Sequence, residues 1–425
     1  MREADWVSVH EACARILARV QPLPPERVAL IDALGRTPVA EIRSPIDQPP
    51  WDNSAMDGFA ARAQDVRGAA RDQPVALRVV ERIPAGGFPS RAVGPGEATE
   101  IMTGAPIPEG ADCVIRIEHT APTADGVAVV NDLDAGRNIR RRGEDVRAGA
   151  VVIEQGRALR ASEIGLLATV GCARVDVHRA PRVAILSTGD ELADLDAFDE
   201  VIAGRKIANS NSYALAAAAR ATGCGVEVLG IARDEAGSLR EHLTRGLEAD
   251  ALVTTAGASV GAHDLVKDAL EALGMQVEFW RVQMRPGSPF SFGVIPRPGR
   301  PLPVFGLPGN PVSALVTFEV LVRPALRRML GRRDVHTRTV EVRAAERIES
   351  RPGLVHFLRV RLEPDGSGGW LARLTGPQGS GLITSMTRAD ALLVVPLDAE
   401  CVAAGAHATA VRLAPTDDAQ DALGY

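Results

Sequence analysis

The chain has 425 residues, of which 46% are hydrophobic, 24% are charged and 4% are aromatic, and its mean hydropathy is +0.02. This composition is typical of a folded globular protein and excludes a disordered or membrane-spanning class, and the length predicts roughly three or four domains. The formal net charge of -6 and the pI near 5.8 argue against a broad nucleic-acid surface, so we expect local basic clusters to bind small anions.

The cysteines and the N-terminal segment indicate a reducing compartment. The five cysteines are scattered and no two have C-x-x-C spacing, which predicts reduced thiols. The first residues include Glu3, Asp5 and Glu11 without an apolar signal-peptide core, and no uncharged apolar stretch is long enough to span a bilayer. We therefore expect a cytoplasmic protein that binds neither membrane nor nucleic acid.

The first predicted element is an amphipathic helix over residues 8–20, where Ser8 and Glu11 have capping-box spacing and apolar residues recur at helical intervals. Prolines end this helix, and a second group of prolines before Trp51 indicates a boundary near residue 50. From residue 51 to 138, short β-like runs alternate with glycine and proline turns, which predicts a small β domain. These runs cover 75–80, 97–102, 112–117 and 126–130.

The following segment begins with a basic turn at 140–142 and continues into a β-like stretch at 150–154. A helix is then predicted from Ser162 to a stop at Gly171. We expect this segment to rejoin the N-terminal helix. Residues 1–50 and 139–178 would then form one discontinuous domain, with the small β domain of residues 51–138 inserted between them.

Between residues 179 and 332, strand patterns alternate with helical patterns, which predicts a doubly wound parallel sheet. Ligands of such a sheet bind at the carboxyl ends of its strands. The last stretch, residues 333–425, is strand-rich and predicts a small C-terminal β domain, either β-barrel-like or a sandwich, so the expected fold class is multidomain α/β plus β. The sheet's expected strands cover 183–187, 226–231, 251–255 and 304–305, and its helices cover 211–222, 236–248, 263–273 and 312–330.

Two glycine-rich loops, at 254–264 and 306–314, follow apolar runs of this α/β unit. In the second loop, Asn310 can cap the next helix and Pro311 suits its first turn. The free N–H groups of such a helix start favour a phosphate or another oxyanion. One loop of this kind is more often an ordinary turn, but two loops in one unit, with carboxylates beside them, favour an anion site.

Charged residues near these loops have a functional and a structural interpretation. Asp190 and Glu191 follow a buried-type strand and could hold Mg²⁺, although Asp190 could instead cap a turn, and Asp264 could be only a solvated helix start. Arg281 and Arg285 have equal parity on one predicted strand, so they could clamp an oxyanion or simply be solvated. The stretches 52–59, 101–112 and 140–142 are ambiguous alone, and no histidines have zinc-site spacing.

Taken in order, these motifs resemble the molybdopterin molybdenumtransferase family, whose relatives include the gephyrin E domain. The resemblance covers essentially the whole chain. Its carriers include Asp-Asn-Ser-Ala-Met-Asp-Gly at 52–58 and Gly-Leu-Pro-Gly-Asn-Pro-Val-Ser at 306–313. The remaining motifs lie at 101–106, 142–145, 187–192, 209–211, 259–267 and 378–386.

The resemblance implies insertion of molybdate into adenylylated molybdopterin, with Mg²⁺-dependent release of AMP. Anionic reactants of this kind need basic groups and helix starts, and a metal needs carboxylates. By matching position, it implies catalytic roles for Asp57, Thr103, Asp145, Glu191, Asp234 and Asp264, and metal binding by Asp190, Glu191 and Asp264. It implies substrate or cofactor binding by Ser187, Thr188, Gly189, Asp190, Gly257, Ser259, Gly261, Lys267, Arg281, Arg285, Pro308, Gly309, Asn310, Pro311, Ser313, Ser380 and Ser385.

The resemblance also implies the four-domain partition given above, assembled as an elongated homodimer with its site between subunits. A molybdopterin adenylyltransferase and apo-molybdoenzymes are the expected protein partners. The chain departs from the family pattern at Ala256, Ala258, Arg285 and Ser288, where Ser288 replaces a usual lysine and removes a positive charge. Three alternatives therefore stay open: use of tungstate, a diverged non-catalytic molybdopterin-binding or scaffolding paralogue, and an adenylyltransferase, against which the four-domain chain argues.

Overall fold

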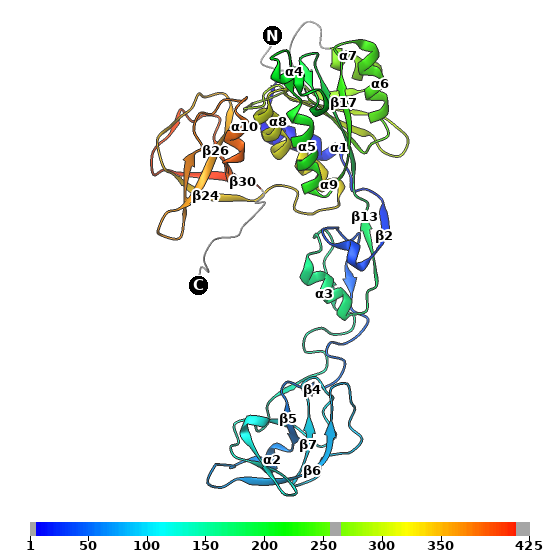
Figure 1. Ribbon diagram of the computed structural model, residues 1–425, viewed down its shortest axis with the longest axis vertical. Helices are drawn as coiled ribbons and strands as arrows, with labels where there is room; N and C mark the ends of the chain where they lie inside the picture. Colours follow the sequence, from blue (N-terminus) through cyan, green and yellow to red (C-terminus); the bar gives the residue numbers. More distant parts are fainter. Residues whose placement is uncertain (1–5, 256–264, 414–425) are drawn as a thin grey trace.

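The structure of the protein is a computed structural model that describes residues 6–255 and 265–413. Figure 1 shows an elongated molecule, with an α/β body and the C-terminal barrel side by side at one end and a small β body at the other. A narrow segment, which we call the stalk, joins these ends and consists of residues 25–54 and 139–178. Within the described ranges, no helix is long and apolar enough to cross a membrane.

The α/β body is built on a six-stranded sheet with the order β17-β14-β18-β23-β22-β19. The first four strands are parallel, and the pairs β23–β22 and β22–β19 are antiparallel. In chain order the parallel strands lie as 2-1-3-4, so the direction of winding reverses between β14 and β18. The bounds are β14 (Arg182–Thr188), β17 (Gly225–Ala232), β18 (Ala251–Thr255), β19 (Gln276–Phe279), β22 (Ser291–Ile295) and β23 (Leu302–Leu307).

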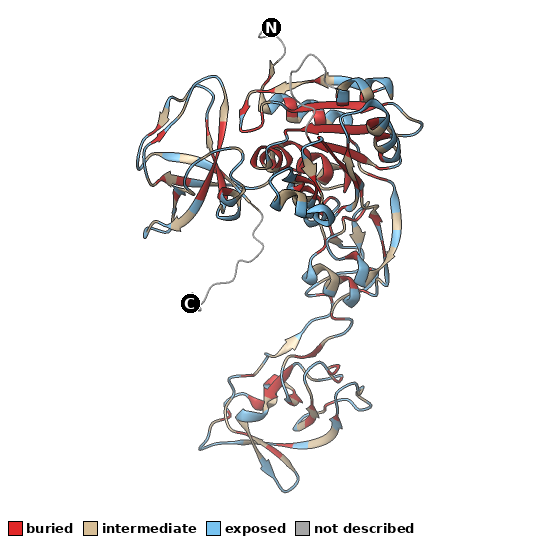
Figure 2. Cartoon of the chain, turned by 45° about the horizontal axis from the view of Figure 1, so that its top comes forward, coloured by how far each residue is buried: buried red, intermediate tan, exposed pale blue. Residues whose placement is uncertain are grey.

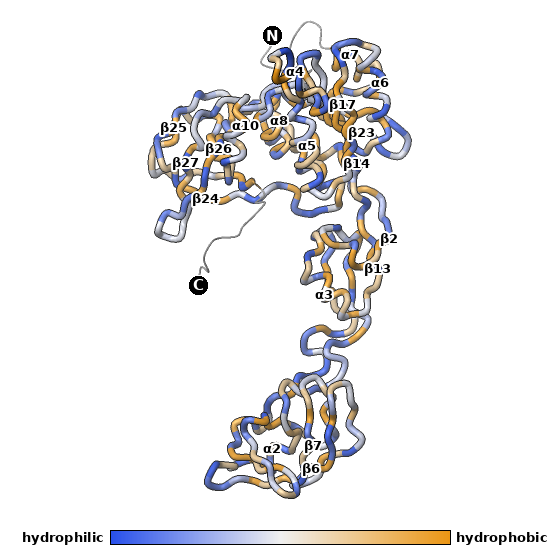
Figure 3. Tube along the Cα trace, viewed as in Figure 1, coloured by the Kyte–Doolittle hydropathy of each residue, from blue (hydrophilic) through white to orange (hydrophobic). Residues whose placement is uncertain are grey.

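Helices cover both faces of this sheet, as the alternating pattern predicted. On one face, α5 (Ser210–Thr222), α8 (Pro311–Thr317) and α9 (Arg323–Met329) form a core with the strands. On the other face, α6 (Ala236–Gly246) and α7 (Leu265–Ala272) form a second core. Because both faces are covered, the central strands are buried along their length in Figure 2 and are mainly hydrophobic in Figure 3.

The N-terminal helix α1 (Val9–Arg19) starts where the sequence predicted, because Ser8 Oγ accepts the backbone N–H of Glu11 at 3.1 Å. The helix buries Ala12 and Ile16 in the same core as α9, so it adds to the α/β body. Just before it, β1 (Trp6–Val7) pairs in parallel with β20 (Arg281–Val282).

The helix expected over 312–330 is interrupted by a π-helical turn, η5 (Phe318–Val322), between α8 and α9. Pro324 explains the interruption, because it has no N–H to donate to the carbonyl of Val320 four residues earlier. The Sγ of Cys13 donates to that carbonyl instead, at 3.4 Å. The π-turn therefore joins this helical run to α1.

In the stalk, the outgoing and returning parts of the chain pair with each other. Antiparallel pairs form between β2 (Pro25–Ala29) and β13 (Arg174–His178), between β3 (Ile42–Arg43) and β12 (Val151–Ile153), and between β4 (Asn53–Ser54) and β11 (Ile139–Arg140). Helix α3 (Ala161–Thr169), which matches the predicted helix, closes a small core over these strands together with the 3₁₀ turn η2 (Leu30–Ala33).

The small β body is a six-stranded sheet with the order β8-β5-β7-β6-β10-β9. All four β-like runs predicted here are strands. Their bounds are β6 (Val75–Ile83), β7 (Glu97–Ile101), β8 (Cys113–Arg116) and β10 (Gly126–Val129). The remaining elements are β5 (Gly58–Ala61), β9 (Thr120–Thr123), the short helix α2 (Ala63–Val66) and the 3₁₀ turn η3 (Ile117–His119).

The C-terminal body is a closed barrel, as predicted. Its five strands follow the order β26-β27-β24-β30-β28, and a pairing between β28 and β26 closes the ring. The bounds are β24 (Thr339–Ala344), β26 (Val355–Pro364), β27 (Trp370–Leu374), β28 (Ala391–Val395) and β30 (His407–Arg412). A short pair, β25 (Ile348–Glu349) with β29 (Cys401–Val402), and helix α10 (Ile383–Thr387) complete this body.

Candidate functional site

A cavity of about 630 Å³ lies at the carboxyl edge of the α/β sheet, and we call it the edge cavity. Thr188 and Thr255, the last residues of β14 and β18, both line it. These are the two strands between which the winding reverses, and this is where open α/β sheets bind their ligands. The other lining residues are Glu191, Leu192, Ile207, Ala208, Asn209, Ser210, Asn211, Pro289, Pro308, Gly309, Asn310, Pro311, Gly381 and Ile383.

A buried hydroxyl and amide network forms the floor of this cavity. The Oγ of Ser187 donates to Asn209 Oδ1 at 2.8 Å and hydrogen-bonds the hydroxyls of Ser212 and Thr255 at 2.8 and 2.9 Å. Ser187 is fully buried, so it does not itself reach the cavity. This predicted ligand residue therefore positions Asn209 and Thr255, which do line it.

Helix α8 offers fewer free donors than the sequence predicted. It begins at Pro311 as expected, but the side chain of Asn310 makes no capping hydrogen bond. Pro311 has no N–H, and the next N–H, that of Val312, donates to the carbonyl of Ser380 at 3.1 Å. The first two positions of this helix therefore offer no free N–H group to an anion.

The two carboxylates after β14 take different positions. Glu191 lines the edge cavity, whereas Asp190 is exposed and does not. Gly189 has φ of 140°, and a Cβ at this position would collide with the Glu191 carboxylate. The glycine thus permits the carboxylate to lie over the end of β14. Among the described residues, no three His, Cys, Asp or Glu side chains are grouped as metal ligands.

In the first glycine loop, the predicted site residues Gly257, Ser259, Gly261 and Asp264 lie outside the described residues, as do the departures from the family pattern at Ala256 and Ala258.

A second cavity of about 620 Å³, the barrel cavity, lies across the loop that contains Gly379 and Ser380. Ser380 lines the barrel cavity, while Gly381, one residue later, lines the edge cavity. Four arginines and a histidine give the barrel cavity its chemistry. They are Arg285, Arg347, Arg351, Arg359 and His356, and Glu349 is the acidic residue beside them.

Arg359, on β26, is the functional residue that the sequence reasoning missed. Its side chain is fully buried, and its Nε donates to the Oγ of Ser385 and its Nη2 to the carbonyl of Gly379, both at 3.0 Å. Its Nη1 has no hydrogen-bond partner among the described residues. Burial lowers the pKa of this guanidinium. A charged residue inside the apolar run 357–360 was the available signal, because a buried arginine normally has a partner.

The prediction that Arg281 and Arg285 share one face of one strand is wrong. Arg281 belongs to β20, and its guanidinium lies over the ring of Trp6, 5.3 Å from the centroid. Arg285 belongs to β21 (Met284–Arg285), which pairs with β26 of the barrel. The chain changes partner between the two short strands, so only Arg285 reaches the barrel cavity.

At the departure site Ser288, the hydroxyl donates to the carbonyl of Met284 at 2.5 Å. This hydroxyl closes the turn, so the position contributes no charge to either cavity.

Three other predicted residues of the α/β body do not line the edge cavity. Asp234 is exposed in the loop after β17, at the same edge of the sheet but outside the cavity lining. Lys267 lies on α7, where it pairs with Glu271 at 3.8 Å and lies over the ring of Trp280. Ser313 is buried on α8, and its carbonyl accepts from Thr317 Oγ1 at 2.8 Å.

The remaining predicted residues lie in the small β body and the stalk. The carboxylate of Asp57 accepts the backbone N–H and the hydroxyl of Thr103, both at 2.7 Å, and these bonds lower the pKa of Asp57. Both residues belong to the small β body (Figure 1). Asp145 lies in the stalk and lines a separate cavity of about 400 Å³. A single chain therefore does not bring these three residues to Glu191.

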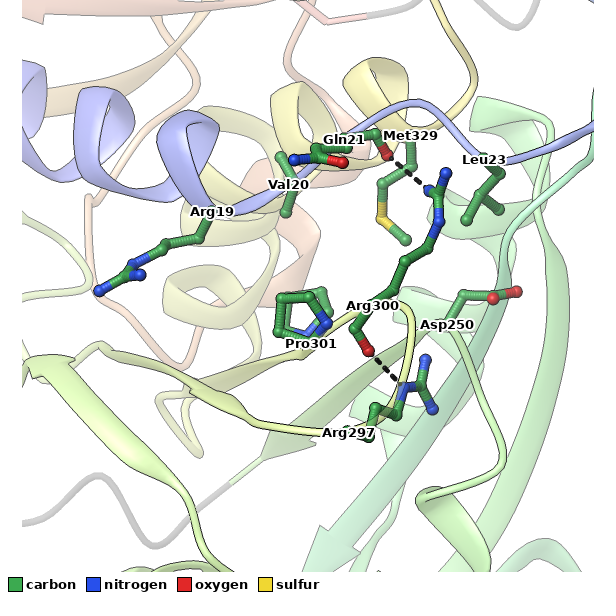
Figure 4. A pocket seen from close by; sticks show the side chains of 10 residues that line it. Arg19, Val20, Gln21, Leu23, Asp250, Arg297, Arg300, Pro301 and Met329 are labelled. Atoms are coloured by element: carbon green, nitrogen blue, oxygen red, sulfur yellow. Dashed lines mark hydrogen bonds between the residues drawn. The ribbon is translucent and has the colours of Figure 1, made fainter.

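A further pocket lies between the end of α1 and the β22–β23 turn (Figure 4). Two arginines in its lining donate hydrogen bonds to backbone carbonyls. Arg297 Nε donates to the carbonyl of Arg300 at 2.9 Å, and Arg300 donates to the carbonyl of Gln21. The enclosed volume is about 20 Å³, close to the space of one water molecule, so no substrate fits.

Comparison with known proteins connects these features to one family. Residues 7–171 match the MoeA N-terminal region (domain I and II), residues 184–328 a probable molybdopterin binding domain, and residues 341–413 the MoeA C-terminal region (domain IV). The chain is 35% identical over 398 residues to a molybdopterin molybdenumtransferase of Nostoc sp., covering 91% of this chain and 88% of the relative. It is 37% identical over 404 residues to molybdopterin molybdenumtransferase 2 of Mycobacterium tuberculosis, covering 94% and 97%.

Among solved structures, the chain resembles a molybdopterin biosynthesis moeA protein from Pyrococcus horikoshii. The TM-score is 0.82 at 28% identity, and the match covers 96% of this chain and all of that one. The similarity therefore extends over the α/β body, the barrel, the stalk and the small β body together.

Proposed function

The chain belongs to the molybdopterin molybdenumtransferase family, and from this premise we propose that it inserts molybdate into adenylylated molybdopterin and releases AMP. The coarser statement, that it is a transferase of molybdenum cofactor biosynthesis, follows from the family itself. The observation that carries the finer proposal is the pair of cavities on the two sides of the loop 378–383.

The edge cavity has the properties expected of the seat for the large organic substrate. Its volume of about 630 Å³ lies in the range of ligand sites, and it occupies the switch point of the sheet. Amides and hydroxyls dominate its polar lining, with Glu191 as the lining carboxylate. These groups orient a neutral heterocycle and its phosphates through directional hydrogen bonds.

The barrel cavity has the properties expected of the oxyanion seat. A tetrahedral dianion needs several fixed positive donors, and Arg359 is held rigidly by Ser385 and Gly379. Its unpartnered Nη1 is a buried donor that a bound oxyanion would satisfy. Arg285, which is exposed, adds a second positive charge to the lining.

A magnesium ion fits the edge cavity in the mode that uses one or two carboxylates and substrate phosphate oxygens. Glu191 would hold it, with Asp190 and Asp264 as the other candidates by resemblance. The ion would neutralise phosphate charge and stabilise the departing phosphate of AMP. Glu191 also keeps its own carboxylate at the end of β14, because Gly189 leaves room for it.

We also propose the homodimer and the domain partition 1–50 with 139–178, 51–138, 179–332 and 333–425, in which α1 of the first segment packs in the core of the α/β body. The resemblance implies roles for Asp57, Thr103 and Asp145, which belong to the small β body and the stalk. Glu191 follows β14 of the α/β body, at the opposite end of the molecule from the small β body in Figure 1. A second chain that placed its small β body and stalk against the edge cavity would unite them in one site.

The test is release of AMP from adenylylated molybdopterin by the full chain, with molybdate or tungstate and with or without Mg²⁺. The proposal expects AMP only when both an oxyanion and Mg²⁺ are present. Tight substrate binding without AMP would instead support a non-catalytic binding protein, and ATP consumption with unadenylylated molybdopterin would support an adenylyltransferase. A preference for tungstate would mean that the same reaction inserts tungsten instead of molybdenum.

A further inference from the structure

The start of helix α5 opens into the edge cavity. Residues 207–211, which lead into this helix and form its first turn, all line the cavity. The helix has 13 residues, so it carries a full positive dipole end toward the cavity. Helix starts of this kind attract anions when their N–H groups are free.

The first two N–H groups of α5 are free, whereas at the first two positions of α8 Pro311 has no N–H and the N–H of Val312 donates to Ser380. The N–H groups of Ser210 and Asn211 have no intrahelical acceptor, and no described residue accepts a hydrogen bond from either. The third N–H, that of Ser212, donates to the side chain of Asn209 at 3.4 Å. Two adjacent backbone donors therefore remain at the mouth of the helix.

The capping residue Asn209 adds a side-chain donor of fixed orientation. Its Oδ1 accepts from the Ser187 hydroxyl and the Ser212 N–H, and because an N–H can only donate, the carbonyl end of the amide must face that group. The Nδ2 is thereby turned the other way. Asn209 is 3% exposed, and its Nδ2 has no hydrogen-bond partner among the described residues. A buried unpaired donor is costly, and a bound acceptor removes that cost.

We propose that the start of α5 binds a phosphoryl oxyanion through the N–H groups of Ser210 and Asn211 and the Nδ2 of Asn209. This inference rests on the proposed function, since the phosphoryl group would be the one carried by AMP in the substrate and product. Three neutral donors and a helix dipole suit such an anion without adding a fixed charge to hold the product after release.

Asn209→Asp tests the side-chain donor, because it keeps the shape and the capping oxygen and replaces the donor by an anionic oxygen. Calorimetric titration of the full chain with AMP, adenosine, inorganic phosphate and molybdate, in Mg²⁺, gives the affinities. We expect N209D to weaken the affinities for AMP and inorganic phosphate by about tenfold or more, which is the loss typical of a hydrogen bond to a charged group. The affinity for adenosine should stay unchanged. Asn131→Asp, the same change in the small β body, should leave all four affinities unchanged.

Ser210→Pro tests the backbone donors without a change in charge. Proline suits the first helical position, where α8 already carries one, and it removes a single N–H. S210P should also weaken the affinities for AMP and inorganic phosphate. Thermal unfolding of both variants shows that they fold.

Three results would overturn the inference. The first is an affinity for AMP that is absent in the parent chain or unchanged in both variants. The others are an equal loss of affinity for AMP and adenosine, and a loss of affinity for molybdate alone. The titration is independent of turnover. A chain that binds AMP at α5 but forms no cofactor would contradict the proposed function alone. Cofactor formation with unchanged AMP binding in both variants would contradict only the α5 site.

Discussion

At the scale of single residues, Arg359 places a fully buried positive charge in the lining of the barrel cavity. A fully buried guanidinium is stable only where its N–H groups find acceptors, and one of them, Nη1, finds none among the described residues. Ser385 and Gly379 fix the other two nitrogens, so the open donor has a defined direction.

We predict that Arg359→Leu raises the molybdate concentration needed for half-maximal AMP release by at least about tenfold, because a charged hydrogen-bonding donor is lost. The fold should persist, since an apolar side chain replaces a buried charge. The exposed neighbour Arg361 on the same strand provides the control, and Arg361→Leu should leave the molybdate dependence unchanged. If AMP release depends on the molybdate concentration equally in both variants, Arg359 does not bind the oxyanion.

The Asp134 carboxylate gives the small β body its own pH dependence. Burial raises its pKa, but hydrogen bonds from Arg116, from Asn138 and from His119 outweigh burial and lower the pKa to about 2. In the unfolded chain the value is about 3.9. The carboxylate therefore stabilises the folded state above about pH 4, and this contribution disappears as the pH falls toward 2.

Asp134→Asn should lower the unfolding temperature at neutral pH, and the difference from the parent chain should shrink between about pH 4 and pH 2. Calorimetric unfolding across this range measures it. Asp125→Asn, in an exposed turn of the same body, is the control and should produce no such convergence. A difference between D134N and the parent that stays constant with pH would contradict the assignment.

At the scale of elements, the end of β14 depends on a glycine. Gly189→Ala places a Cβ against the Glu191 carboxylate at a φ of 140°. Strain of this kind costs about 1–3 kcal/mol, and the collision additionally displaces the carboxylate. We expect G189A to lower kcat for AMP release.

Gly230→Ala provides the matched control for this substitution. Gly230 lies in β17 of the same sheet, with a φ of 98° and open space where a Cβ would lie. It should lose comparable stability without the loss of kcat. If both variants lose kcat equally, the position of Glu191 is not what Gly189 protects.

Regular elements were predictable because their signals are local. Ser8 marked the start of α1, and alternation marked the strands of the small β body. Pro324 signals an irregular helix because it has no N–H to donate. The carbonyl that this leaves without a helical donor is bound by Cys13 from a helix distant in sequence, which no local pattern predicts.

The site was predictable only in part, because it depends on which segments meet. The parity of Arg281 and Arg285 assumed a straight strand, whereas the chain passes from β1 to the barrel between them. The use of the Val312 N–H by Ser380 is likewise a contact between bodies that no local pattern encodes.

At the scale of the whole molecule, the separation of Asp57 from Glu191 gives the dimer proposal a direct test. Asp57→Asn and Glu191→Gln, each inactive as a pure protein, should regain part of the activity when the two variants are mixed and allowed to exchange subunits. Mixed dimers would contain one site with both native residues. Mixing that restores nothing, despite demonstrated exchange, would place each site within one chain.

In the proposed function, one reaction couples molybdate insertion to the release of AMP. The most direct measurement is the amount of AMP released and of molybdenum bound to the pterin product in the same reaction, using the full chain, adenylylated molybdopterin, molybdate and Mg²⁺. We expect equal amounts of the two products and no AMP without an oxyanion. Release of AMP in the absence of any oxyanion, or molybdenum incorporation without AMP, would contradict it.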